Sequence, residues 1–426
     1  MIICNFNKLK IVQNIGLKVI ITILILVVLV GLSIVSLSNK IAYAATEVSG
    51  SIVSDTTWTV ANSPYVITGH IVVESGANLT IDPGVTVKFD WVKIMLVEGG
   101  LIAKGTVSNE ILFTSNESSP SPGDWGYIKF EQGSIGTIYD SNDEYLSGSI
   151  LEYCRVEYSG FYDEVAIAGA PFVNACTIVN NSYGGVDAYR YTGIPGQYDS
   201  VRITNSVISQ NTGGGMGIAR AKNAIISGNT ISGNKLGVRI LGGTTTVINN
   251  IITNNSGDNW AAGIFGNIDS GSMVLISHNY IADNAGAGVH LIKQNGGSSA
   301  TATVSNNEIL RNQGAGVRVG GGGLGSSQPD FTFNILDNMI IANNANRGGG
   351  IYIDDRSPTI NVINNILQDN MANEGTALWI TDEGTGNNTD TFKYNTIVGT
   401  SGESLIFKYQ GDPSIKYNDF LRGSEI

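Results

Sequence analysis

The stretch VINNIITNN, residues 247–255, decides the fold, because it sets an asparagine pair behind each of two short aliphatic runs. The arrangement returns as ISHNYIADN (276–284), VSNNEILRN (304–312) and VINNILQDN (362–370). Asparagine favours turns and disfavours strands, whereas Ile and Val favour strands. The repetition therefore predicts one kind of turn, made many times between short strands.

Two asparagine positions, five residues apart, define the repeat. When the second Asn of INN is the reference position, an aliphatic residue follows two positions later and a second Asn usually follows five positions later. The reference position is filled, at steps of 21 to 31 residues, by Cys154, Cys176, Ser206, Asn229, Asn250, Asn279, Asn307, Asn338, Asn365, Asn395 and Asn418. The position five residues later is filled by Ser159, Asn181, Asn211, Asn234, Asn255, Asn284, Asn312, Asn343, Asn370 and Thr400. So many matches indicate a repeat array over 151–426.

Each unit continues into a further short strand, such as GVRIL (237–241), GVHLI (288–292) or GIYID (350–354). Several short strands per unit, with no helical stretch between them, predict an all-β fold: one parallel β-helix, whose coils stack about 4.8 Å apart. Asn tolerates the left-handed backbone that a tight corner needs, and stacked amides can hydrogen-bond along a row. We therefore interpret the asparagines as structural corner ladders.

Composition and charge narrow the class of protein. Only 14% of the 426 residues are charged and 42% are hydrophobic, which argues against disorder. Residues 1–44 hold four Lys and no acidic residue, so the rest of the chain has 20 basic and 36 acidic residues, a net charge of −16. This balance disfavours nucleic acid and anionic membrane surfaces as partners.

The first 44 residues have the pattern of an export signal. Lysines precede an apolar run over 19–37, and an Ala-Tyr-Ala cleavage motif ends at Ala44. We expect cleavage after Ala44; an uncleaved run would instead be long enough to anchor the chain in a membrane. Basic residues before the run keep that end in the cytoplasm, so both alternatives predict an extracytoplasmic body, secreted or at the cell surface.

The front of the chain carries further recognisable segments: TWTVANSPYVITGHIVVESGANLTIDPGVTVKF (57–89), GDWGYIKF (123–130) and LEYCRVEYSG (151–160). Together with the repeat, they make roughly residues 50–426 similar to the right-handed parallel β-helix repeat family, the pectate-lyase-like superfamily. The resemblance implies a right-handed β-helix, with 45–150 as its N-terminal coils and cap. It leaves function open, because relatives include polysaccharide lyases, hydrolases, epimerases and adhesins.

The enzyme motifs of that superfamily do not match this chain. Polygalacturonase-like hydrolases carry Asn-x-Asp, Asp-Asp, Gly-His-Gly and Arg-x-Lys in that order. Here Asp354-Asp355 follows His290 instead of preceding it, and the one Arg-x-Lys, Arg220-Ala221-Lys222, lies before both instead of after them. The calcium and arginine signatures of pectate lyases are not recognisable either. Known chemistry therefore cannot be carried over from the family.

Alternate residues of the strand after the second Asn are expected to point outward. One outward row is predicted to contain Asp187, Gly217, Arg239, Phe265, His290, Arg318, Tyr352, Trp379 and Ile406. A second outward row is predicted to contain Tyr189, Asn267, Asp354, Thr381 and Lys408. Aromatic rings pack on sugar faces, while arginines and carboxylates bind hydroxyl or uronate groups. We expect substrate binding by Arg239, Phe265, His290, Arg318, Tyr352, Asp354, Trp379 and Lys408; the alternative is an ordinary solvated face.

Acidic residues concentrate near the C-terminal end. Aligning the strands pairs Asp355 with Asp382 and Arg356 with Glu383. Two carboxylates one coil apart would be separated by about 5 Å, as in a retaining glycosidase, which makes Asp355, Asp382 and Glu383 the catalytic candidates. The same two aspartates are candidate calcium ligands, and the third alternative is turn acids that face water. No other cofactor is indicated.

Cys154 and Cys176 occupy the same ladder position in consecutive units. Their predicted separation of about 5 Å would permit a disulfide in an oxidising compartment. Parallel side chains in a row strain that geometry, so we favour two small buried thiols.

These patterns predict an exported, monomeric β-helix protein that binds a polysaccharide or cell-surface glycan along one face. The first alternative is a polysaccharide lyase or glycoside hydrolase that uses the acidic cluster with Lys408 or Arg318. The second is an adhesive or structural rod without enzymatic activity.

Overall fold

The computed structural model describes most of the chain after the predicted export segment. The described residues are 44–131, 133–142, 144–188, 200–257, 261–294, 299–321, 331–355, 359–382, 390–399, 406–408 and 414–422. Ala45–Ile426 forms one compact unit. The predicted apolar run over 19–37 lies outside the described residues, and within them no helix has the length and apolar character needed to cross a membrane.

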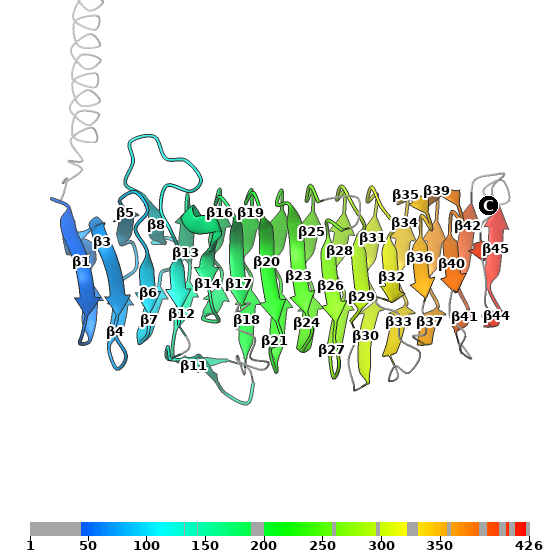
Figure 1. The fold of residues 1–426 in the computed structure, drawn as a ribbon, viewed down its shortest axis with the longest axis horizontal. Helices are drawn as coiled ribbons and strands as arrows, with labels where there is room; N and C mark the ends of the chain where they lie inside the picture. Colours follow the sequence, from blue (N-terminus) through cyan, green and yellow to red (C-terminus); the bar gives the residue numbers. More distant parts are fainter. Residues whose placement is uncertain are drawn as a thin grey trace, which may run out of the picture. The chain divides into compact units, whose positions relative to one another are not determined.

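The chain winds into coils, and each coil adds one strand to each of three faces, as Figure 1 shows. All pairings between neighbouring coils are parallel, so the predicted all-β, right-handed parallel β-helix is confirmed. The first face is a 14-stranded sheet. Its strands are β2 (Thr56–Trp58), β4 (Asn78–Ile81), β7 (Gly100–Lys104), β12 (Ile150–Glu152), β15 (Phe172–Asn174), β18 (Val201–Thr204), β21 (Ala224–Ser227), β24 (Thr244–Ile248), β27 (Met273–Ser277), β30 (Ala300–Ser305), β33 (Phe331–Leu336), β37 (Thr359–Ile363), β41 (Thr391–Lys393) and β44 (Ser414–Lys416).

A 27-stranded sheet supplies the other two faces. The second face, mostly of short strands, contains β5 (Thr86–Phe89), β8 (Ile111–Ser115), β13 (Cys154–Glu157), β16 (Thr177–Val179), β19 (Val207–Ser209), β22 (Thr230–Ser232), β25 (Ile251–Thr253), β28 (Tyr280–Ala282), β31 (Glu308–Leu310), β34 (Met339–Ile341), β38 (Ile366–Gln368), β42 (Thr396–Gly399) and β45 (Asp419–Arg422). The third face contains β6 (Met95–Val97), β9 (Ile128–Phe130), β14 (Val165–Ala168), β17 (Gly184–Ala188), β20 (Gly214–Ala219), β23 (Leu236–Leu241), β26 (Ile264–Ile268), β29 (Val289–Lys293), β32 (Val317–Gly321), β36 (Ile351–Asp355), β40 (Leu378–Asp382) and β43 (Ile406–Lys408). Strands β1 (Thr46–Ile52) and β3 (Tyr65–Val73) begin this sheet, and β3 pairs with both β5 and β6.

Short elements stand outside the coils. They are the 3-10 turns η1 (Val60–Asn62) and η2 (Phe161–Asp163), the antiparallel pair β10 (Ile138–Tyr139) and β11 (Tyr145–Ser147), and the parallel pair β35 (Asn344–Arg347) and β39 (Met371–Glu374). The β35–β39 pair extends the corner between the second and third faces in two consecutive coils.

The core is built from the inward side chains of all three faces, and the short strands of the second face contribute one aliphatic column to it. The position two residues after the reference Asn is at most 1% exposed at Val156, Ile178, Ile208, Ile231, Ile252, Ile281, Ile309, Ile340, Leu367 and Ile397. Burying each such side chain stabilises the fold by about 1.5–3 kcal/mol. Each coil thus contributes its own part of one continuous core.

The predicted ladders exist as two buried columns of amides. In the first column, Nδ2 of Asn279 donates to Oδ1 of Asn307 (3.0 Å), and the backbone N–H of Asn279 donates to the same oxygen (2.9 Å). In the second column, Asn284 makes the same two bonds to Asn312, at 2.9 and 3.1 Å. Every buried amide therefore has its partners in the neighbouring coils, which satisfies the hydrogen-bonding rule for a dry interior.

The left-handed residue of each corner is not the ladder asparagine but the residue before it. Asn249, His278 and Asn306 have φ of 56°, 55° and 55°, and they precede Asn250, Asn279 and Asn307. This corrects the prediction from the sequence, which assigned the left-handed backbone and the ladder amide to the same residue. The two asparagines of a pair have different roles. The first adopts the left-handed backbone, which Asn tolerates, and the second buries its side-chain amide in the ladder.

Cys154 and Cys176 are buried free thiols, as favoured from the sequence. The Sγ of Cys176 donates to the carbonyl of Leu151 (3.3 Å), a bond equivalent to that of a ladder Nδ2. The ladder continues from Cys176, whose backbone N–H donates to Oγ of Ser206 (3.1 Å). Burial, followed by the hydrogen bond with Cys176, raises the pKa of the Cys154 thiol. Both cysteines therefore serve as ladder residues.

Candidate functional site

The predicted outward row lies on the third face. Backbone register aligns residues of successive coils from β17 to β40: Asp187, Gly217, Arg239, Phe265, His290, Arg318, Tyr352 and Trp379. Asn267, Asp354 and Thr381 share the second row, as expected, and Tyr189 lies outside the described residues. These rows bring together seven of the eight predicted binding residues.

The register of the last coil differs from our prediction. Phe407, not Ile406, pairs with Trp379, and Lys408 pairs with Ile380. Lys408 therefore belongs to the row of a buried isoleucine rather than to an outward row. The error is one residue, which changes the face in a strand. The sequence SLIFK lacks the glycine that marked the register of most earlier coils.

Two of the predicted exposed rings are covered. Trp379 is 3% exposed and His290 is 2% exposed, although both belong to the outward row. The ring of His290 meets the ring of Phe265 edge-on, with centroids 5.5 Å apart. An outward direction therefore does not make a side chain accessible here, and the Trp379 ring is not an open platform.

The rings and arginines of the row form a stacked column. The guanidinium of Arg318 lies 4.5 Å above the Tyr352 ring, and Tyr352 stacks on Trp379 with centroids 4.6 Å apart and planes 15° apart. Arg347 of β35 lies 5.0 Å from the Trp379 ring, and its Nε is 2.8 Å from Oε2 of Glu374 on β39. Cation–π contacts thus place both guanidinium groups against rings of the column.

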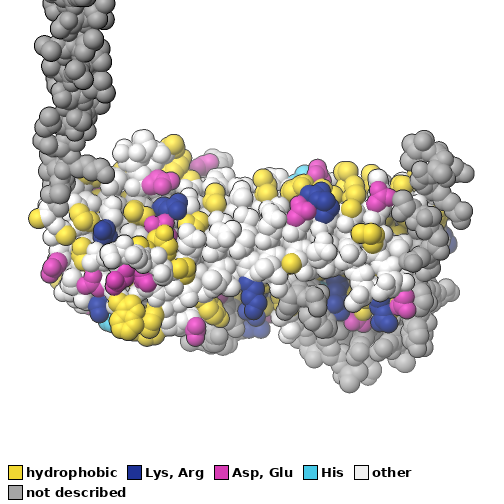
Figure 2. All heavy atoms as spheres, turned by 90° about the horizontal axis from the view of Figure 1, so that it is seen from above, with side chains coloured by type: hydrophobic (Ala, Val, Ile, Leu, Met, Phe, Trp, Pro, Cys, Tyr) yellow, Lys and Arg dark blue, Asp and Glu magenta, His cyan; other side chains and the backbone are white. Residues whose placement is uncertain are grey.

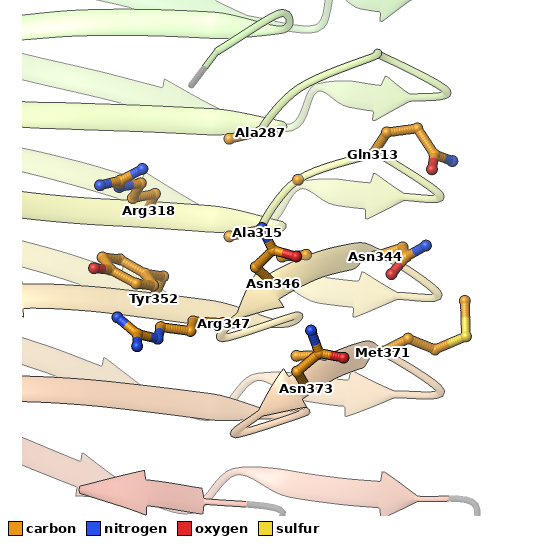
Figure 3. Close-up of a pocket in the computed structure, with 13 residues that line it drawn as sticks. Ala287, Gln313, Ala315, Arg318, Asn344, Asn346, Arg347, Tyr352, Met371 and Asn373 are labelled. Carbon is orange, nitrogen blue, oxygen red and sulfur yellow. The ribbon is translucent and has the colours of Figure 1, made fainter. Parts of the chain in front are cut away.

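A groove of about 670 Å³ lies between this column and the β35–β39 pair. Figure 3 shows Arg318 and Tyr352 on one side, Asn344 and Met371 on the other, and Asn346 and Asn373 between them. The lining is Ala287, Gln313, Gly314, Ala315, Arg318, Asn344, Ala345, Asn346, Arg347, Tyr352, Met371, Ala372 and Asn373. Volumes of this order are usual for ligand sites, and this one offers two guanidinium groups and several amides.

The sequence-based prediction missed the β35–β39 side of the groove, although a signal existed. Gly350 lies seven positions after ladder Asn343, whereas Gly316 lies four positions after Asn312. The same longer spacing follows Asn370. Each of these connections is three residues longer and contains NANR or MANE, which form β35 and β39.

The catalytic candidates are aligned as predicted in the backbone. Asp355 of β36 pairs with Asp382 of β40, and Asp354 pairs with Thr381, whose Oγ1 donates to Oδ1 of Asp354 (3.3 Å). Glu383 and Arg356 lie outside the described residues. In the described part of the chain, no three His, Cys, Asp or Glu side chains gather closely enough to hold a metal ion.

Comparison with protein families and solved structures agrees with the fold. Residues 164–334 and 297–390 match the family described as "Right handed beta helix region", and residues 50–168 match "Pectate-lyase like beta helix domain". The Drosophila melanogaster "Protein bark beetle" is 34% identical over 84 residues, which are 20% of this chain. The matched region spans 3% of the length of that relative.

Solved structures with a similar course of the chain include the periplasmic alginate epimerase AlgG. It is 12% identical, with a TM-score of 0.50 over 88% of this chain and 85% of that one. The Azotobacter vinelandii mannuronan C-5 epimerase AlgE4 A-module is 15% identical, with a TM-score of 0.32 over 90% and 88% of the two chains. At these identities the likeness concerns the fold.

Proposed function

Because the chain belongs to the right-handed parallel β-helix family, we propose that it binds an acidic polysaccharide in the groove beside β35 and β39, outside the cytoplasm. The observation that carries this proposal is the pair of stacked arginines at the groove. Arg318 and Arg347 both line it, and each is held against an aromatic ring.

The groups of the groove fit a uronate-containing chain. Guanidinium groups bind carboxylates through charge-assisted hydrogen bonds, which are stronger than neutral ones. The amides of Asn344, Asn346 and Asn373 supply donors and acceptors suited to hydroxyl groups. All three asparagines stand on β35 and β39, and the main-chain pairing of these strands fixes their spacing.

Stacking on a ring restricts an arginine side chain before the ligand arrives, which reduces the entropy lost on binding. Arg347 also pairs with Glu374, so the charge of the groove is partly balanced. A polyanion is favoured over a single small anion, since many weak contacts along a polymer add together. The alginate epimerases share the course of the chain with this protein, and the proposal itself rests on the groove.

A second candidate function is hydrolysis, favoured by the pairing of Asp355 with Asp382. Paired residues on neighbouring parallel strands lie about 4.8 Å apart, close to the separation of about 5–5.5 Å found in retaining glycosidases. Release of reducing ends from a polyuronate, lost in both Asp355→Asn and Asp382→Asn, would support this candidate over simple binding.

The binding proposal is tested by calorimetry with a polygalacturonate oligosaccharide and with the same oligosaccharide after reduction of its carboxyl groups. We expect the acidic form to bind and Arg347→Ala to weaken it about tenfold, since a charged hydrogen bond contributes about 1.5–3 kcal/mol. The matched control is Arg155→Ala, because Arg155 is also paired with a glutamate, at 2.7 Å, but lies on β13.

Three results would contradict the proposal: equal binding of the acidic and reduced forms, equal weakening by Arg347→Ala and Arg155→Ala, or no binding of an acidic oligosaccharide. Thermal melts of each variant exclude unfolding as the cause of a loss. Asn373→Ala is a second variant of the groove. The Asn373 side chain lines the groove but is not part of the stacked column of rings and arginines.

A further inference from the structure

Three aromatic residues cluster on the surface near the N-terminal end of the solenoid, far from the groove in sequence. Trp91 is 61% exposed and Tyr162 is 57% exposed. The ring of Phe161 lies between them: it meets Trp91 edge-on at 5.6 Å and Tyr162 edge-on at 4.6 Å. We call Trp91, Phe161 and Tyr162 the aromatic patch. A contiguous exposed patch of this kind marks a binding surface more often than a lone ring does.

The turn that presents Trp91 is held by backbone hydrogen bonds. The N–H of Lys93 donates to the carbonyl of Asp90 (3.1 Å), which closes the turn around Trp91. The N–H of Val92 donates to the carbonyl of Asp124 (2.9 Å), which ties the turn to the next coil. The indole therefore stands on a fixed backbone, so little backbone entropy is lost when a ligand binds.

The second turn is tied down in the same way. The N–H of Phe161 donates to the carbonyl of Trp125 (3.0 Å), and the N–H of Gly160 donates to the carbonyl of Gly126 (2.8 Å). Within it, Tyr162 has φ of 66° and Asp163 has φ of 56°. A left-handed backbone is unfavourable for a bulky side chain, and such strain is found at functional sites more often than elsewhere. Here it holds the Tyr162 ring out in solvent.

The charges around the patch differ from those of the groove. The three turns at 90–93, 121–126 and 160–164 carry one lysine, Lys93, and four acidic residues: Asp90, Asp124, Asp163 and Glu164. Burial, with Glu164 among the smaller contributors, raises the pKa of the neighbouring Tyr127 phenol, so this group stays neutral. Carboxylates beside aromatic rings accept hydrogen bonds from hydroxyl groups and repel anions. In the view of Figure 2, hydrophobic, acidic and basic side chains are all seen at the left of the solenoid, while its middle is mostly uncoloured.

The patch and the groove occupy the same corner of the coils. The Trp91 turn joins β5 to β6, the η2 turn joins β13 to β14, and β35 joins β34 to β36; all three connect the second face to the third. Nine register steps separate Leu96 of β6 from Tyr352 of β36. At about 4.8 Å per step, these two residues are about 43 Å apart along the axis.

We propose that the aromatic patch is a second saccharide-binding site, which takes uncharged, β-linked pyranose residues. Such rings present flat faces of C–H groups, which stack on Trp91 and Tyr162, and equatorial hydroxyl groups, which reach the carboxylates at the rim. The patch would thus recognise a different part of a heteropolymer, or a different glycan, from the arginine groove. It does not depend on the groove being a binding site.

The test uses the full chain with three hexasaccharides: β-linked glucose, β-linked N-acetylglucosamine and galacturonate. Tryptophan fluorescence and calorimetry measure binding. We expect a neutral hexamer to bind, and Trp91→Ala and Tyr162→Ala each to weaken it about tenfold, while Trp91→Phe retains part of the affinity. The matched control is Tyr417→Ala, since Tyr417 is 71% exposed and lies at the other end of the solenoid.

Arg347→Ala separates this proposal from the function of the groove, because it should leave neutral-hexamer binding unchanged. The proposal is overturned if neither neutral hexamer binds, if binding is equal in wild type and Trp91→Ala, or if Tyr417→Ala weakens it as much. A change in sedimentation of Trp91→Ala without any glycan binding would assign the patch to a contact between copies of the chain, and this also overturns it. Both substituted side chains are exposed, and melting temperatures verify that the variants fold.

Discussion

Replacing Asn307 by leucine tests whether the amide ladder stabilises the coils. Its Nδ2 donates to the carbonyl of Ile276 (2.9 Å) and to Oδ1 of Asn338 (3.0 Å). Its Oδ1 accepts from the backbone N–H and from Nδ2 of Asn279, at 2.9 and 3.0 Å. Leucine removes all four bonds and leaves the Asn279 donors buried without that acceptor. At about 1 kcal/mol for each bond, and more for stranded donors, we expect a loss of about 3–5 kcal/mol.

Two further substitutions, one at Asn307 and one at its exposed neighbour, provide a smaller change and a control. Asn307→Ser should cost about 1–3 kcal/mol, because a hydroxyl keeps one acceptor, as Ser206 does for the N–H of Cys176 in the native ladder. Glu308→Leu, next in sequence and exposed on β31, should change stability by no more than about 0.5 kcal/mol.

Equilibrium urea denaturation, followed by circular dichroism, measures the three variants. Solenoids can unfold in segments, so the comparison uses the first transition of each curve and requires equal slopes. The reasoning is refuted if Asn307→Leu and Glu308→Leu shift the transition equally, because the buried amide would then contribute nothing that an exposed carboxylate does not.

Three other predictions follow from the same structure. Trp379→Ala should cost about 3–5 kcal/mol in thermal or urea unfolding, because the ring is 3% exposed; a loss below about 1 kcal/mol would mean that the ring is not packed as described. Iodoacetamide should modify neither Cys154 nor Cys176 in the native protein, because burial keeps the Cys154 thiol protonated, and mass spectrometry of the two peptides would expose an adduct. If Asp355 and Asp382 bind calcium, it should raise the melting temperature of the wild type but not of Asp355→Asn or Asp382→Asn; an unchanged wild type would leave the two residues as turn acids that face water.

Most of the fold could be predicted because every unit places the same types of residue at the same positions. A buried amide at one corner of a coil needs a hydrogen-bond partner in the coil above and in the coil below. Most units therefore carry an asparagine at the same position. That regularity gave the register of the outward row from Asp187 to Trp379. The glycine marker is replaced by Ala377 in the strand of Trp379 and is absent from the next strand, and there, at Phe407, the prediction slipped by one residue.

The groove was harder to predict because it departs from the repeat. β35 and β39 are additions at one corner, and their register with one another depends on pairing across coils rather than on a period. The predicted exposure of Trp379 was wrong for a related reason. A period of two tells which way a side chain points, but identical spacing along the axis also stacks ring upon ring, and Arg347 from β35 packs on the last one.

The direction of the ladder bonds gives the solenoid an electrical polarity. In both columns one N–H of each Nδ2 donates to the side-chain oxygen of the next coil toward the C-terminus, and the other donates to a main-chain carbonyl of the coil before it. The side-chain carbonyls therefore all point toward the N-terminal end. Aligned amide dipoles add, as they do in an α-helix, and neighbouring bonds in such a chain polarise one another. Since an interior amide has neighbours on both sides, substituting Asn307 should cost more than the same change at Asn418, near the last described coil. The two columns thus form two parallel dipoles along the axis, with their negative ends toward the first coils.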